Sequence, residues 1–235
     1  MTAPIPIVLV PGFWLGAWAW DEVVGHLDDA GHRAIAITLP GLEPDREDRG
    51  SVMMADHVDA IVSAVEAAGD RVVLAVHSGA GVPGYQVTDR IPERIAAMVY
   101  VDTGPATGPL NGDFADDVWE FPGIDTLRDE ENLDGLSDVQ LARFADLAVA
   151  EPGNAVRGFL ELSNDARRAV PSTMICTGFT GEQYREALAE GYAFVGGLGE
   201  LTDVTYIDLP TSHWPMWSRP SDLAEVLGDI ASTAE

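Results

Sequence analysis

The sequence predicts an α/β protein with a mostly parallel, doubly wound sheet and an inserted helical cap. Over about the first 100 residues, short β-branched runs alternate with segments whose apolar residues recur at helical spacing, and no hairpin turn joins two runs. Strands without hairpins need crossover connections, which make neighbouring strands parallel. The alternation stops after Thr103 and resumes near residue 171. With 235 residues, the chain has room for one large domain that carries such an insertion.

The first part of the chain supplies strands and helices in alternation. The run IPIVLV at 5–10 is β-branched and ends at Pro11, as a buried strand does before a turn. In the segment 54–69 the apolar side chains share one face, which predicts a helix. We expect strands at 5–10, 32–38, 71–76 and 94–102, and helices at 20–30, at 54–69 and in a short stretch that ends near Arg90.

The second part contains the insertion and the rest of the sheet. Residues 104–170 are polar, acidic and helical in pattern, and no strand is predicted there, so we expect a helical cap. The α/β core then comprises residues 1–103 and 171–235. Beyond the cap we expect strands at 172–178 and 203–210 and helices at 181–191 and 221–232.

Charge and composition exclude several classes of partner. The net charge is −26, and all 13 basic residues are arginine. Such a surface repels nucleic acid and anionic membranes, so we expect neither of them as a partner. The partner we expect, from the motifs described below, is a small-molecule substrate. No apolar run approaches the ~20 residues of a membrane helix, and the N-terminus lacks the basic start of a signal peptide, so we expect a cytoplasmic protein. Composition makes no prediction for the oligomeric state.

The sequence also predicts that no metal or cofactor takes part. The single cysteine, Cys176, is flanked by strand residues and has the pattern of a buried apolar side chain. The chain has no H-E-x-x-H motif, no cysteine pair and no phosphate-binding P-loop.

The segment VHSGAGVPG at 76–84 allows two interpretations. The glycines from Gly79 to Gly84 have the G-x-G-x-x-G spacing of a dinucleotide-binding turn, and Asp102 lies where the ribose-binding carboxylate is expected. However, two residues separate the preceding strand from the first glycine, and a complete βαβ unit comes before the motif. A G-x-G-x-x-G pattern alone is weak, so we favour the second interpretation, which concerns Ser78.

Ser78 stands where a buried strand turns into a helix, as the nucleophile of a serine hydrolase does. This nucleophile elbow needs small residues two places before and after the serine, because their side chains meet across the turn. Ala80 satisfies this condition, and Gly81 leaves clearance between the helix and the sheet. Val76 is a departure from the usual glycine. In the alternative interpretation, Ser78 only caps the helix.

Two further segments supply what a serine nucleophile requires. His213, in LPTSHWPMW, directly follows the last predicted strand, where an imidazole can reach the elbow as the base. The developing oxyanion needs main-chain N–H donors from the residue after the serine and from the loop after the first strand. Gly79 supplies the first donor, and Phe13 supplies the second because Gly12 lets the chain approach closely.

Three stretches together resemble the α/β-hydrolase superfamily, most closely its small esterase and hydroxynitrile-lyase branch. They read VLVPGFWLGAWAWDEVVGHL, VLAVHSGAG and IDLPTSHWPMWSRPSDLAEVL, and the resemblance covers nearly all of the chain outside the cap. It implies the hydrolase fold and the order nucleophile, acid, base. Two residues depart from the pattern: Pro11 replaces the usual histidine before Gly12, and Val76 replaces the elbow glycine.

The acid of the triad has two candidates. In this superfamily the acid usually follows the strand after the cap, where the first acidic residue is Glu182 in a predicted helix. A variant of the family has the acid one strand earlier, and that position is Asp102. We prefer Asp102 because the end of a strand positions a side chain better than the start of a helix. In the alternative interpretation, Asp102 only forms the turn that follows its strand.

The predicted activity is cleavage of an ester, lactone or thioester of a small apolar compound through an acyl-enzyme on Ser78. The first alternative is a C–C bond hydrolase or lyase with the same triad, although the resemblance ties cyanide release to a lysine that this chain lacks. The second is a non-catalytic ligand binder. No substrate-binding residue is assigned, and the cap aromatic residues that could face the substrate are Trp119, Phe121, Phe144 and Phe159.

Overall fold

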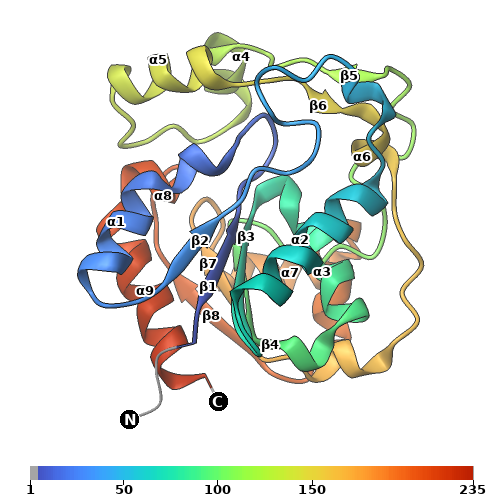
Figure 1. The fold of residues 1–235 in the computed structure, drawn as a ribbon, viewed down its shortest axis with the longest axis vertical. Coiled ribbons are helices and arrows are strands. Elements are labelled where there is room, and N and C mark those ends of the chain that lie inside the picture. The colour runs from blue at the N-terminus through green and yellow to red at the C-terminus, as the bar shows by residue number, and fades with distance from the viewer. Residues whose placement is uncertain (1–4, 235) are drawn as a thin grey trace.

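A six-stranded, wholly parallel sheet forms the centre of the molecule in the computed structural model, which describes residues 5–234 (Figure 1). Across the sheet the order is β2 (Ala34–Ala36), β1 (Ile7–Val10), β3 (Val72–His77), β4 (Ile95–Val101), β7 (Ser172–Cys176) and β8 (Val204–Asp208). Every neighbouring pair in this sheet runs parallel, as the lack of hairpins predicted.

Helices cover both faces of the sheet, which makes the fold doubly wound. The helices of the core are α1 (Asp21–Asp29), α2 (Met54–Ala68), α3 (Gly81–Arg90), α7 (Gly181–Glu190), α8 (Pro215–Ser218) and α9 (Pro220–Thr233). Alternate residues of β3 belong to different hydrophobic clusters: Leu74 packs with residues of α2 and α3, and Ala75 packs with residues of α1 and α9. This burial on both faces explains why the central strands β1, β3 and β4 read as nearly continuous apolar runs.

Local sequence signals account for both ends of α7. The Thr180 side chain accepts a hydrogen bond from the Gln183 N–H, and the Gln183 side chain accepts one from the Thr180 N–H, so α7 begins with a capping box. The same helix ends at Gly191, whose φ of +84° favours glycine.

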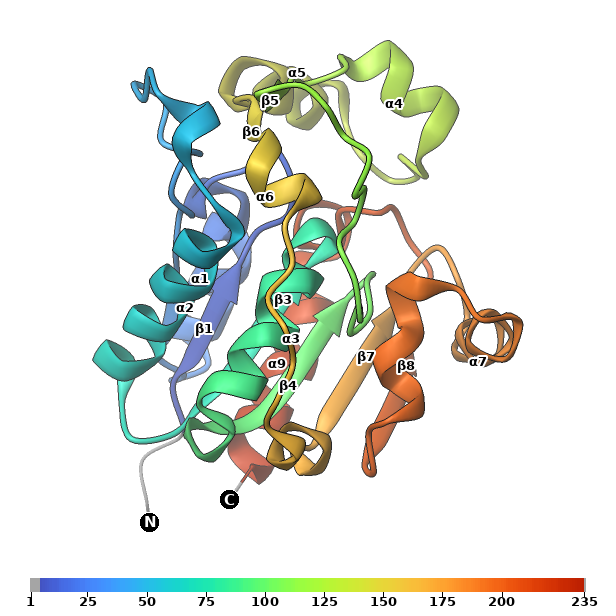
Figure 2. The same ribbon diagram turned by 90° about the vertical axis from the view of Figure 1, so that its right-hand side faces the viewer.

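The larger part of the segment between β4 and β7, up to about residue 157, lies over the carboxyl ends of the strands, and the chain then descends beside α3 to the start of β7 (Figure 2). It contains the helices α4 (Ile124–Glu130), α5 (Asp138–Leu147) and α6 (Gly153–Arg157). It also contains two short antiparallel strands, β5 (Val118–Trp119) and β6 (Glu151–Pro152), where we predicted no strand. Each has two residues, too few for an alternating pattern to be visible in the sequence.

The predicted elements of the core all exist, and their ends differ by a few residues. The second strand, expected at 32–38, is limited to Ala34–Ala36 at the edge of the sheet. The ends of the expected core at residues 1–4 and 235 lie outside the described residues. Among the helices of the described part, none is both long enough and apolar enough to cross a membrane.

Candidate active site

Four strand ends bring the candidate residues together at one edge of the sheet. Phe13 follows β1, Ser78 follows β3, Asp102 follows β4 and His213 follows β8. Because the strands are parallel, all four carboxyl ends lie on the same side, the side covered by the segment between β4 and β7.

Ser78, His213 and Asp102 form a continuous chain of hydrogen bonds. Ser78 Oγ lies 2.9 Å from His213 Nε2, and His213 Nδ1 lies 2.6 Å from Asp102 Oδ2. The side chains of Asp102 and His213 are only 9% and 15% exposed. In this arrangement His213 Nδ1–H donates to Asp102, which leaves Nε2 free to accept the Ser78 proton.

Burial and hydrogen bonding oppose each other in the His213–Asp102 pair. Burial alone lowers the pKa of His213, but the hydrogen bond to Asp102 and the charge of that carboxylate raise the pKa above its ordinary 6.5. Burial alone raises the pKa of Asp102, whereas its bonds with His213, Thr177 and Gly178 hold the pKa below the ordinary 3.8. At neutral pH the pair is therefore a fixed carboxylate beside a base that gains a proton easily.

The strand after the insertion supports the acid instead of supplying one. The N–H groups of Thr177 and Gly178, which directly follow β7, each donate to Asp102 Oδ1 over 3.2 Å. Asp102 itself has a φ of +48°, a conformation that L residues rarely adopt. Glu182 is an exposed residue in the first turn of α7, and among residues 5–234 it forms no ion pair or side-chain hydrogen bond with His213.

The turn at Ser78 has the strained conformation of a nucleophile elbow. Ser78 has a φ of +50°, and a short 3-10 turn at Ser78–Ala80 leads directly into α3. Val76 is fully buried two residues earlier. A Cβ at Gly84 would lie 2.7 Å from Val76 Cγ1, so the missing side chain at Gly84 makes the room that the usual elbow glycine provides.

The three glycines of the alternative dinucleotide interpretation have other contacts. A Cβ at Gly79 would lie 2.6 Å from the Phe13 ring, and a Cβ at Gly81 would lie 2.6 Å from Thr103 Oγ1. Gly84 receives the Val76 side chain, although we assigned it no role from the sequence. All three glycines therefore permit close packing around the elbow, and Asp102 binds His213.

Gly12 and Phe13 lie beside the elbow, as the oxyanion interpretation requires. A Cβ at Gly12 would lie 2.8 Å from Ser78 Cβ and 3.0 Å from the His77 carbonyl oxygen, so no larger residue fits. Phe13 and Gly79 line the same cavity as Ser78 and His213. Among residues 5–234, the Phe13 N–H donates to no main-chain or side-chain acceptor, which leaves it available to a ligand.

Two residues that we did not predict hold the main chain of His213. The His213 N–H donates to the Asn132 carbonyl oxygen over 2.8 Å, and the His77 ring donates from Nε2 to the His213 carbonyl oxygen over 2.7 Å. Burial and the nearby His213 lower the pKa of His77 to about 3, so its ring is neutral. The sequence carries no periodic signal for either contact, because both join residues from separate segments.

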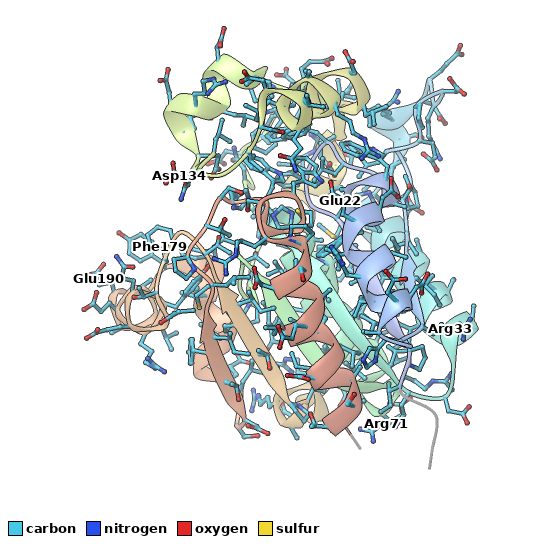
Figure 3. The ribbon with its side chains drawn as sticks, turned by 90° about the vertical axis from the view of Figure 1, so that its left-hand side faces the viewer. Glu22, Arg33, Arg71, Asp134, Phe179 and Glu190 are labelled. Atoms are coloured by element: carbon cyan, nitrogen blue, oxygen red, sulfur yellow. The ribbon has the colours of Figure 1, made fainter. Side chains whose placement is uncertain are left out.

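A cavity of about 460 Å³ opens beside the candidate triad. Its wall combines apolar side chains with polar ones. The apolar part consists of Phe13, Leu110, Phe179, Tyr184 and Phe194. Figure 3 labels Phe179, in the segment that leads into α7, below Asp134 of the insertion. The cavity suits a small and largely apolar ligand whose reacting group reaches Ser78.

The cap aromatic residues that we considered from the sequence lie elsewhere. None of Trp119, Phe121, Phe144 and Phe159 lines this cavity. Phe144 is fully buried and packs against Trp214 and Trp217 instead. The insertion contributes Leu110, Glu130, Glu131 and Asn132 to the wall.

Cys176 is buried, and among the described residues no group of three or more His, Cys, Asp or Glu side chains is placed to hold a metal ion. Burial raises the pKa of the Cys176 thiol to about 12, which keeps it protonated.

Comparison with known proteins places the chain in a family of enzymes. A sequence model of the alpha/beta hydrolase family matches residues 7–226. Methylesterase 7 of Arabidopsis thaliana is 24% identical over 255 residues, which cover 95% of each protein. A solved extracellular alpha/beta-hydrolase from Paenibacillus species is 20% identical with a TM-score of 0.75 and covers 98% of this chain and 100% of that one. The solved structure of a polyneuridine aldehyde esterase mutant is 19% identical with a TM-score of 0.73. The match covers 96% of this chain and 98% of that one.

Proposed function

The chain belongs to the alpha/beta hydrolase family and is an esterase-like hydrolase, and from that premise we propose that it cleaves small apolar esters through an acyl-enzyme on Ser78. The observation that carries the proposal is the hydrogen-bonded series from Ser78 through His213 to Asp102 at the wall of the 460 Å³ cavity. A ligand binder has no need for a base and a buried acid aligned on a strained serine.

Acylation begins when Ser78 Oγ attacks the ester carbonyl carbon. His213 Nε2, 2.9 Å away, accepts the hydroxyl proton as the new C–O bond forms. The carbonyl oxygen becomes an oxyanion, to which Phe13 and Gly79 donate their main-chain N–H groups. Asp102 holds the imidazole by its Nδ1–H and stabilises its positive charge.

The intermediate collapses when the ester C–O bond breaks. His213 gives its proton from Nε2 to the leaving alcohol oxygen, which leaves the acyl group on Ser78. Water then attacks the acyl carbon while His213 again accepts a proton. The second tetrahedral intermediate releases the carboxylic acid, and Ser78 Oγ recovers its proton from His213.

The substrate class follows from the cavity wall and the net charge. The wall offers aromatic and aliphatic side chains together with the carboxyl groups of Glu130 and Glu131, and within residues 5–234 no arginine lines the cavity. With a net charge of −26, the protein repels anions, so neutral esters, lactones or thioesters of a small apolar compound are the proposed substrates. The relative named a methylesterase supports an ester with a small alcohol part among them.

We also propose that residues 104–170 act as a cap over a core formed by residues 1–103 and 171–235. The helices α4, α5 and α6 of this segment lie above the strand ends, and its Asn132 binds the main chain of His213. In this role it shields the acyl-enzyme from bulk water and selects the substrate.

Labelling with a serine-directed fluorophosphonate tests the proposal. We expect the reagent to label the wild type and Ser63→Ala, a matched control in which an exposed serine of α2 is lost, and not to label Ser78→Ala. A panel of p-nitrophenyl esters measured in parallel should show turnover in the two labelled proteins only. Equal labelling of the wild type and Ser78→Ala contradicts the proposal, and ligand-dependent thermal stabilisation without labelling or turnover identifies a binder instead.

A further inference from the structure

Trp14, next to the proposed oxyanion donor Phe13, has an unusual backbone conformation. Its φ is +64°, and its side chain is 8% exposed. A bulky L residue rarely adopts this conformation, and it persists only where the surroundings hold it. The turn at Trp14 determines where the chain on either side of it points, and that includes the Phe13 N–H.

Three hydrogen bonds hold Trp14, and all three partners lie in the segment between β4 and β7. The Val149 N–H donates to the Trp14 carbonyl oxygen over 3.1 Å, and the Trp14 indole N–H donates to the Trp119 carbonyl oxygen over 3.1 Å. The Trp14 main-chain N–H donates to Glu151 Oε2 over 3.3 Å. Trp119 and Glu151 are themselves paired across β5 and β6, so the contacts form one unit.

Among these residues, Glu151 is unusual because its carboxyl group is buried. It is 2% exposed and, within residues 5–234, forms no ion pair. It lines a cavity of only about 10 Å³ together with Gly12, Phe13 and Gly79, directly behind the proposed oxyanion donors. Burial raises the pKa of the Glu151 carboxyl to about 8 although the Trp14 N–H opposes the shift, so the group is mostly neutral at pH 7.

Burying a carboxyl without a partner charge costs stability, and the hydrogen bond from the Trp14 N–H offsets part of that cost. We propose that Glu151 is a positioning residue of the oxyanion hole: from the cap, its side chain holds the Trp14 main chain in the left-handed turn that aims the Phe13 N–H at the substrate carbonyl. The inference rests on the proposed function, in which Phe13 donates to the oxyanion. It follows that the cap completes the catalytic site in addition to covering it.

Binding of a trifluoromethyl ketone tests the role of Glu151. Such a ketone adds to the serine and forms a stable oxyanion, so its inhibition constant reports the oxyanion hole. Loss of one oxyanion donor costs about 10²–10³-fold in kcat. We expect Glu151→Met, which has a similar size and no carboxyl oxygen, to weaken inhibition by about 30–100-fold and to lower kcat similarly, with KM within about threefold of the wild type.

Two variants separate positioning from general stability. Glu151→Gln keeps an oxygen that accepts the Trp14 N–H, and we expect its kcat and inhibition constant within about fivefold of the wild type. Leu141→Ala removes a buried side chain of α5, and we expect it to lower the melting temperature without changing the inhibition constant. If Glu151→Met does not fold, Glu151→Asp replaces it, because the shorter side chain withdraws the carboxyl by one methylene and should weaken inhibition at least about fivefold.

The outcomes distinguish this inference from the proposed function. Fluorophosphonate labelling of the wild type together with unchanged inhibition of Glu151→Met overturns the positioning role and leaves the proposed function intact. Equal losses in Glu151→Met and Leu141→Ala also overturn it, because general destabilisation then explains both. If the wild type is neither labelled nor inhibited by the ketone, the proposed function fails and the inference fails with it.

Discussion

The proposed nucleophile elbow at Ser78 depends on the contact between Val76 and Gly84. Val76 occupies the position where the elbow usually has glycine, and its side chain lies where a Cβ at Gly84 would be. The substitution Gly84→Ala tests whether the Val76 side chain needs the space at Gly84. The new methyl group would lie 2.7 Å from Val76 Cγ1 and 2.9 Å from Met98 Cε, whereas ordinary contacts begin at 3.4 Å.

The expected loss of stability follows from two opposing effects. Alanine in a helix interior is favoured over glycine by about 1 kcal/mol. Overpacking typically costs 1–3 kcal/mol, and we expect the upper part of this range because Val76 is β-branched and stiff, although the end of Met98 can move. The net prediction for Gly84→Ala is a decrease of about 1–2 kcal/mol in the free energy of unfolding.

A double-mutant cycle with Val76→Ala isolates the contact. Val76→Ala removes two buried methyl groups and should cost about 2–3 kcal/mol, including the cavity. In the double variant the methyl of Ala at position 84 fills part of that cavity, so we expect it to be about 2 kcal/mol more stable than the sum of the single effects. Urea unfolding of the four proteins measures this coupling energy.

The same substitution should affect the chemistry of the elbow. Gly84→Ala pushes α3 away from β3 and displaces Ser78, whose Oγ lies 2.9 Å from His213 Nε2. Since a displacement of about 1 Å can cost 10²-fold, we expect fluorophosphonate labelling to slow by roughly tenfold, and Val76→Ala to restore it in the double variant. Two results together would refute the idea that Gly84 provides the space usually left by a glycine at position 76. Gly84→Ala would be as stable as the wild type, and the stability effects of Gly84→Ala and Val76→Ala would add within about 0.5 kcal/mol.

Other predictions concern the acid, the base and the buried carboxyl. Asp102→Asn should lower kcat roughly 10³–10⁴-fold and Glu182→Gln should leave it within about twofold, and the opposite order assigns the acid to Glu182. Because protonated His213 accepts no proton, the acid side of the kcat/KM profile should have a midpoint above 6.5, and this midpoint should move to lower pH in Asp102→Asn. With a pKa raised from 4.5 to about 8, Glu151 is protonated in the folded protein where it is ionised in the unfolded chain. The free energy of unfolding should therefore fall as pH rises through this window, by at most roughly 1.4 kcal/mol per pH unit, and Glu151→Gln should remove the decline; equal pH slopes in both proteins contradict this.

The fold and several candidate residues were predictable because their signals are local. Alternation of β-branched runs and amphipathic segments is read over windows of about ten residues, and it predicts the parallel sheet that the structure contains. Ser78 and His213 follow predicted strands, and the carboxyl ends of parallel strands meet at one edge, so their approach was predictable without knowing any distance.

The short strands β5 and β6 were not predicted because they have no local sequence signal. Each spans two residues and is stabilised by its partner and by Trp14, so neither has a periodicity of its own. The role of Gly84 was missed because a glycine in a helix gives no indication of which side chain from another element occupies its empty position.

By itself the sequence determined the order of strands and helices along the chain, the strongly acidic composition without lysine, and the positions of a serine, a histidine and a glycine-led loop at strand ends. Only the tertiary structure decided which acid reaches His213, since Asp102 and His213 are 111 residues apart and the N–H groups after β7 direct the carboxylate. It also decided that Glu151 meets Trp14 across 137 residues. The physical reason is that periodicity governs which face of an element is buried, whereas the contact between two particular side chains depends on how separate elements pack.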